Sequence, residues 1–162
     1  MLTWEDFILH YCAANYLSDF YYITDISKAA MTVKCAKSHR DYCRWGGLLK
    51  KEIEIVGQPD CRLIPVGKIA EEFLHKMLPV PKDRICERII HYSPLAGRSR
   101  GTIPATDVSK DDIRDHAVHF LTDNKIPESI RKKVMDKLKE PELTLSRKRL
   151  IFAYREAFKR LS

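Results

Sequence analysis

The chain has 162 residues, of which 44% are hydrophobic and 31% are charged, a balance typical of one folded soluble domain. It excludes a disordered chain, and no apolar run reaches the roughly 18 residues that a membrane-spanning helix needs. The formal net charge is +7, and its whole excess lies in residues 125–162, where 12 Lys and Arg accompany 5 Asp and Glu. Such a concentrated charge attracts polyanions such as nucleic acids, although contacts with a ribosome or a membrane surface, or plain solubility, also fit it.

The N-terminus and the cysteines indicate a compartment. The first residues lack the basic and apolar regions of a secretory signal. The number of cysteines is odd and no CxxC pair occurs, which argues against a disulfide framework and fits a reducing environment. We therefore expect an intracellular protein, in the cytoplasm or the nucleus, that does not enter a membrane. The cysteines are Cys12, Cys35, Cys43, Cys61 and Cys86.

The first hundred residues alternate between predicted strands and helices. Thr3 and Asp6 form a capping-box pattern at the start of a helix, and residues 20–24 are aromatic and β-branched, as in a buried strand. A helix over 41–56, a strand over 61–67, a helix over 68–78 and a strand over 84–90 follow. This alternation predicts an α/β fold with a small parallel sheet in three α/β/α layers.

The remaining residues predict helices alone. Ser109 and Asp112 form a second capping-box pattern, and the helix that they begin is predicted to run to about Leu121. Pro127 marks the first turn of the next helix, and residues 146–161 carry the apolar spacing of a last one. We therefore divide the chain into an α/β unit over residues 1–104 and a basic helical segment over residues 105–162.

Three segments at the ends of the predicted strands carry motifs. Residues 21–28 read YYITDISK, residues 63–70 read LIPVGKIA, and residues 89–97 read IIHYSPLAG. In this order they resemble the "YITN..K", "LVxLGxxA" and "HPSP" motifs of the uracil-DNA glycosylase superfamily. The resemblance covers about residues 20–100, so that residues 1–104 look like the C-terminal part of a glycosylase-like domain.

The resemblance implies a site for a base that has been taken out of the stack. Thr24 and Asp25 would contact the polar edge of the base, and His91 would be the catalytic residue, donating to the base as negative charge develops there. Asp25 stands where the family has Asn, and an ionised carboxylate only accepts hydrogen bonds, which argues against uracil as the base. The alternatives are that Asp25 caps a turn and that His91 makes a hydrogen bond within a loop.

Several residues around these motifs, most of them basic, are candidates for contacts with the nucleic-acid backbone. Near the motifs they are Lys28, Gly67, Lys68, Ser93, Arg98 and Arg100, and Leu95 is a candidate wedge for the vacated base position. In the last predicted helix Lys148, Arg155 and Lys159 share a face with Phe152. This face suggests nucleic-acid binding, although a solvated helix face has the same pattern.

Some expected parts of a glycosylase are not found. No residue before Phe20 matches the family loop that positions water, so another segment or a second chain would have to supply that carboxylate. The cysteines do not fit a [4Fe–4S] cluster, because Ala29 follows Lys28 where a ligand is expected. We therefore expect no metal and no organic cofactor. Zinc at Cys35, His39 and Cys43, or a metal at Asp112, His116 and His119, is the alternative.

These observations lead to one main hypothesis. The chain is expected to bind nucleic acid, DNA rather than RNA, and to hydrolyse the N-glycosidic bond of a damaged or modified base if a water-positioning group is supplied. The alternatives are a non-catalytic nucleic-acid-binding module and a protein-interaction module that docks an acidic partner.

Overall fold

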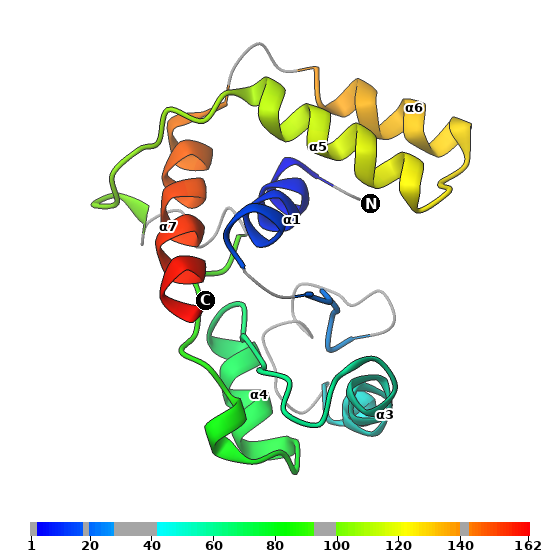
Figure 1. Ribbon diagram of the computed structural model, residues 1–162, viewed down its shortest axis with the longest axis vertical. Coiled ribbons are helices and arrows are strands. Elements are labelled where there is room, and N and C mark those ends of the chain that lie inside the picture. Colours follow the sequence, from blue (N-terminus) through cyan, green and yellow to red (C-terminus); the bar gives the residue numbers. More distant parts are fainter. Residues whose placement is uncertain (1–2, 18–19, 28–41, 93–99, 140–142) are drawn as a thin grey trace. The chain divides into compact units, whose positions relative to one another are not determined.

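The computed structural model describes residues 3–17, 20–27, 42–92, 100–139 and 143–162, and these are mainly helical (Figure 1). The chain divides into two compact units. The first, which we call the helical unit, consists of Met1–Tyr21 and Tyr92–Ser162. The second, the central unit, consists of Tyr22–His91. The predicted boundary at residue 104 lies inside the helical unit, whose first helix comes from the N-terminal end of the chain.

The helical unit is built around α1, Trp4–Tyr16, which packs against both α5 and α7. The predicted capping box at its start is confirmed, because the Asp6 backbone N–H donates to Thr3 Oγ1 and the Thr3 backbone N–H donates to Asp6 Oδ2 at 2.8 Å. These bonds satisfy amide groups that the first helical turn leaves without a partner. The buried side chains of α1 are Trp4, Phe7, Ile8, Leu9, Cys12 and Ala13.

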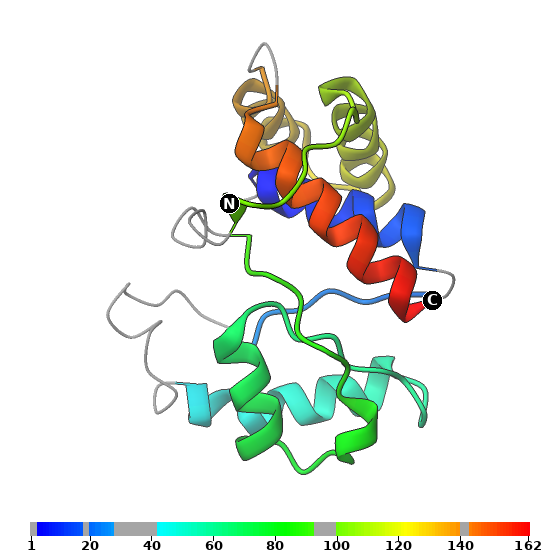
Figure 2. The same cartoon turned by 90° about the vertical axis from the view of Figure 1, so that its left-hand side faces the viewer.

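Helix α7, Leu145–Leu161, lies across α1 (Figure 2). Its buried stripe of Leu150, Ile151, Tyr154, Ala157 and Phe158 follows the helical spacing that the sequence predicts. At the start of α7 the Arg147 side chain donates to Glu5 Oε1 at 2.9 Å and lies over the Trp4 ring. The two ends of the chain are therefore joined through one packed core.

Helices α5, Lys110–Asp123, and α6, Glu128–Lys137, form an antiparallel hairpin in the same unit (Figure 1). The capping box of Ser109 and Asp112 is confirmed, with mutual bonds of 3.0 and 3.2 Å. Lys125, with φ 52°, turns the chain between the two helices. The hairpin buries Ile113, Ala117 and Leu121 from α5, Val134 from α6 and Leu138 directly after α6.

The central unit contains α3, Gly46–Val56, and α4, Lys68–Met77, with 3-10 turns at Cys43–Trp45 and Lys82–Arg84. The predicted helices over 41–56 and 68–78 are thus largely confirmed. A core cluster forms from Leu49 of α3 and from Phe73, Leu74 and Leu78 in and after α4. The partly buried side chains packed on it are Ile26, Tyr42, Ile53, Leu63, Val80 and Ile85.

The predicted α/β fold is wrong, since the described residues are helical and contain no sheet. Of the predicted strands, the two around α4 pair in parallel, but only through two isolated bridges, Leu63↔Ile85 and Val66↔Ile89. Between these bridges one segment advances three residues and the other four, so the register slips by one and a regular ladder does not continue. Pro65 also lacks an N–H with which to extend it.

The prediction of a buried strand over residues 20–24 is also wrong. The described residues there have no regular secondary structure, and Phe20, Tyr21 and Tyr22 are exposed. An aromatic and β-branched run therefore does not fix a strand by itself, because strand formation depends on a partner edge and on a face to bury.

Candidate functional site

The start of α4 is shaped by Gly67, which has a φ of 90°. Its N–H donates to the carbonyl of Ile89 at 2.9 Å, and its carbonyl accepts from the N–H of Glu71 at 3.2 Å. Gly67 therefore ends one of the paired segments and begins the helix within a single residue. This φ lies in a region that residues with a side chain rarely adopt.

His91 lies directly against Gly67 in the central unit. A Cβ atom added to Gly67 would come within 2.9 Å of both Cβ and Cδ2 of His91. The bridge Val66↔Ile89 holds Ile89 beside the residue that precedes Gly67. His91, two residues after Ile89, therefore lies at the N-terminal end of α4. The His91 side chain is exposed and the start of a helix favours negative charge, so a bound group could meet both features together.

Salt bridges surround this helix start. Arg88 Nη1 lies 2.6 Å from Glu71 Oε2, and Lys68 and Lys76 both approach Glu72, at 3.5 and 3.8 Å. Lys68, which is predicted to contact the backbone of a nucleic acid, is the first residue of α4 and is exposed. Exposed pairs of this kind contribute little stability, about 0–1 kcal/mol, so Lys68 can exchange Glu72 for a phosphate at low cost.

Thr24 and Asp25, the predicted base-binding residues, lie in an exposed segment that is anchored to α3. Thr24 Oγ1 donates to Glu52 Oε1 at 3.0 Å, and the Tyr22 hydroxyl donates to the same oxygen at 2.8 Å. The bond to Glu52 raises the pKa of Tyr22. Burial and then the charge of Asp25 raise the pKa of Tyr42, the residue that precedes the 3-10 turn at Cys43–Trp45. Glu52 cannot be singled out from the sequence, since it looks like any charged residue of an amphipathic helix.

Three predicted contacts lie outside the described residues: Lys28, Ser93 and Arg98. The candidate wedge Leu95 lies outside them as well, as do Cys35 and His39. Arg100 is described and is 3% exposed. Its guanidinium donates to the Tyr92 carbonyl at 2.7 Å and to Ser146 Oγ at 3.1 Å. A contact of Arg100 with a phosphate would require these bonds to break.

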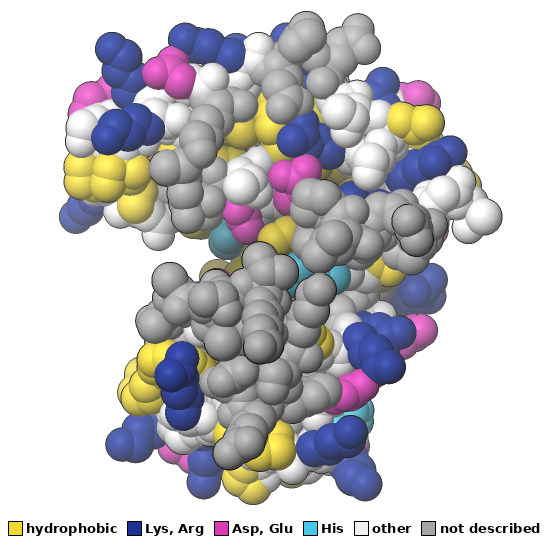
Figure 3. All heavy atoms as spheres, turned by 180° about the vertical axis from the view of Figure 1, so that it is seen from behind, with side chains coloured by type: hydrophobic (Ala, Val, Ile, Leu, Met, Phe, Trp, Pro, Cys, Tyr) yellow, Lys and Arg dark blue, Asp and Glu magenta, His cyan; other side chains and the backbone are white. Residues whose placement is uncertain are grey.

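The basic face of α7 combines cations with aromatic rings. Arg155 lies 4.9 Å from the centre of the Phe152 ring and also pairs with Glu156, and Lys159 lies 5.7 Å from the centre of the Tyr16 ring. Lys148 is half-buried on the same helix. Cation–π contacts hold these side chains in place while leaving N–H donors for other groups. Figure 3 shows the lysines and arginines of one face of the molecule spread among other side chains rather than gathered in one patch.

The metal alternatives gain no support from the described part of the chain. Within it, no group of three or more His, Cys, Asp and Glu side chains could hold a metal ion. Asp112 is instead engaged by Ser109 in the cap of α5. The His116 ring packs edge-on against Tyr11, with ring centres 5.8 Å apart. The zinc alternative with Cys35 and His39 falls on residues that are not described.

Comparisons of the chain with protein-family models, with curated proteins and with solved structures found no match. Among the described helices, none is both long and apolar enough to cross a membrane.

Proposed function

We propose that this chain is a nucleic-acid-binding protein that resembles the uracil-DNA glycosylases in three short motifs, and that a base is recognised beside His91 at the start of α4. The observation that carries the proposal is the packing of His91 against Gly67, within 2.9 Å of where a Cβ would stand. Two of the three motif segments meet at this point, although they are more than twenty residues apart in the sequence.

The chemistry at this point suits an anion. An imidazole N–H and the helix start both favour negative charge, and an N-glycosidic bond that breaks leaves negative charge on the departing base. His91 would donate to that base, while Thr24 and Asp25 would read its polar edge. Because an ionised Asp25 only accepts, the preferred base would present donors where uracil presents O4.

Cations are the candidates for holding the nucleic-acid backbone, and each unit has its own. Lys68 is exposed at the start of α4, and Arg155 and Lys159 are positioned on α7 by aromatic rings. Contacts of this kind are independent of sequence and weaken as salt rises. DNA is proposed rather than RNA, following the motif resemblance.

Hydrolysis would join a water oxygen to C1′ of the sugar, break its bond to the base nitrogen and release the base with a proton. His91 stabilises the leaving base in this scheme. A carboxylate that positions the water would come from another segment or from a second chain, because the motif that carries it is not found in this sequence. Without that group the same site binds a base and does not release it.

The test is incubation with single-stranded and duplex oligonucleotides carrying uracil, hypoxanthine, xanthine or 5-methylcytosine, whose amino group stands where uracil has O4. Retention and abasic-site formation are measured together. We expect His91→Ala to abolish any abasic product and to remove the preference for a modified base. His75→Ala, at an exposed position of α4, is the matched control and should change neither. Binding without product would identify a non-catalytic binder, and no retention at low salt would refute nucleic-acid binding.

A further inference from the structure

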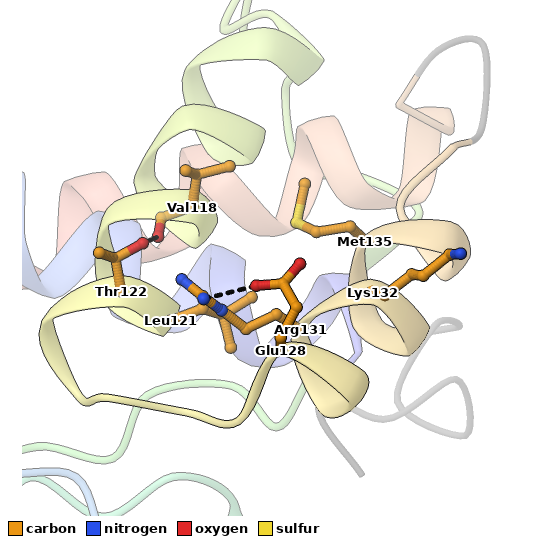
Figure 4. A pocket seen from close by; sticks show the side chains of 7 residues that line it. All are labelled: Val118, Leu121, Thr122, Glu128, Arg131, Lys132 and Met135. Atoms are coloured by element: carbon orange, nitrogen blue, oxygen red, sulfur yellow. Dashed lines mark hydrogen bonds and ion pairs between the residues drawn. The ribbon is translucent and has the colours of Figure 1, made fainter.

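A hollow lies between the two helices of the α5–α6 hairpin, and Figure 4 shows it from close by. Its volume is about 320 Å³. The lining comes from Val118, Leu121 and Thr122 of α5 and from Glu128, Arg131, Lys132 and Met135 of α6. These positions follow helical spacing on both helices, so the hollow runs along the hairpin for about two turns of α6.

The hollow has an apolar floor and a charged rim. Leu121 is buried at its base, whereas Val118 is 44% exposed, and Met135 adds a flexible apolar side chain. On the rim Arg131 pairs with Glu128 at 2.5 Å, and Lys132 lies exposed on the next position of α6 (Figure 4). Methionine adapts to apolar groups of different shape, which suits a surface that accepts a side chain from another molecule.

The charge and composition of the lining favour one class of occupant. The rim has two cations against one carboxylate, so an anionic group is attracted to it. The described lining contains no aromatic ring on which a base could stack, in contrast to sites for single-stranded nucleic acid. A hollow about two turns long between two helices, with Val118, Leu121 and Met135 as its apolar lining, is instead a shape that accepts the apolar side of a helix.

We propose that this hollow docks an acidic amphipathic helix of a partner protein, with an aliphatic side chain on Val118, Leu121 and Met135 and carboxylates near Lys132 and Arg131. The proposal depends on the α5–α6 hairpin alone and is independent of base recognition at His91. It assigns the hairpin a role as an assembly surface.

The test is fluorescence anisotropy with a fluorescein-labelled alanine-based helix of about five turns, carrying leucine at i, i+4 and i+7 and glutamate on the flanking positions. The comparison peptide has lysine in place of each glutamate. We expect saturable binding of the acidic peptide alone. Val118→Glu should weaken that binding at least about tenfold, and Lys132→Glu by roughly three- to tenfold, because they remove the apolar floor and the rim cation.

Two matched controls lie on α6. Ile130 is 49% exposed and Lys133 is exposed, and neither lines the hollow. Ile130→Glu and Lys133→Glu should therefore leave peptide binding within about twofold of the original protein. If Val118→Glu lowers the helix content measured by circular dichroism, Met135→Ala replaces it in the comparison. The proposal is overturned if the acidic peptide does not bind, if the lysine peptide binds as well, or if the control variants lose as much binding as Val118→Glu and Lys132→Glu.

Discussion

His91 packs directly on Gly67 in the central unit, where the absence of a side chain on the glycine makes room for the imidazole. A Cβ on Gly67 would lie 2.9 Å from His91 Cβ, closer than such atoms approach in proteins. The φ of 90° at Gly67 independently excludes most side chains. One residue thus determines both the start of α4 and the position of the histidine.

Gly67→Ala should destabilise the central unit and disturb His91. We expect a loss of at least about 1–3 kcal/mol in the free energy of unfolding, because the alanine must hold an unfavourable φ and also displace the imidazole. Gly47→Ala is the control: a Cβ there meets nothing within 4 Å, and alanine in a helix gains about 0.5–1 kcal/mol over glycine. Urea unfolding measures the free energy of unfolding of both variants. Equal stability of the two variants would contradict the packing of Gly67 on His91.

The helical unit should lose stability in mild acid because of His10 and His116. Burial first, and then the charge of His116, lower the pKa of His10, and burial and then the charge of His119 lower that of His116; Asp6 opposes the first shift. The His10 ring packs on the Phe120 ring, and the two ring centres lie 4.6 Å apart. A histidine of the unfolded chain has a pKa of about 6.5, so below that pH the unfolded chain binds protons that His10 and His116 of the folded unit do not yet bind. Stability is therefore unaffected above that pH and falls as pH decreases below it.

The measurement is urea unfolding between pH 8 and pH 5, followed by the fluorescence of Trp4 in a Trp45→Phe background. The free energy of unfolding should fall with decreasing pH by at most about 1.4 kcal/mol per pH unit for each histidine that stays neutral in the folded unit. His10→Gln and His116→Gln should each flatten it. His75→Gln, on α4 of the central unit, should leave it unchanged. A pH profile that is the same in all variants would show that these two histidines do not cause the effect.

Glu52 should control the titration of Tyr22. The Tyr22 hydroxyl donates to Glu52 Oε1 at 2.8 Å, and this bond, with smaller effects of burial and of the Glu52 charge, raises the pKa of the phenol. Glu52→Ala should therefore lower the pKa of Tyr22 toward its ordinary value of about 10. Proton NMR of ring-labelled tyrosine follows each residue separately, and Tyr154, buried in α7, provides an unaffected reference. An unchanged Tyr22 pKa would mean that the segment with Thr24 and Asp25 is not anchored to α3 in solution.

The helices could be predicted from local chemistry, whereas the sheet could not. The caps at Thr3 and Ser109 depend on residues three positions apart, so the sequence contains all that they require. The segments at Leu63 and Ile85 do come together in parallel, but regular pairing needs a common register over several residues, and theirs slips by one. The Phe20–Thr24 run shows the same limit, because its exposure depends on which surface the rest of the chain offers.

The candidate site was predictable only in part, because motif residues can be read from the sequence whereas contacts between separate elements cannot. Gly67 and His91 were each singled out from their motif segments, and the structure places them in contact. The anchoring of Thr24 by Glu52 was not predictable, since it joins residues of different elements through exposed polar side chains. The burial of Arg100 under Tyr92 and Ser146 was equally hidden, because an arginine in a basic loop looks the same in sequence whether it faces solvent or the core.

The most direct test of base recognition is the ratio of dissociation constants for two oligonucleotides that differ in one base, modified in the first and unmodified in the second. Anisotropy titrations would measure this ratio for the original chain and for His91→Ala at one fixed low salt concentration. We predict that the original chain prefers the modified base by about tenfold or more, and that His91→Ala binds both with nearly equal affinity. Equal affinities in the original chain, or a preference that survives in His91→Ala, would contradict the account.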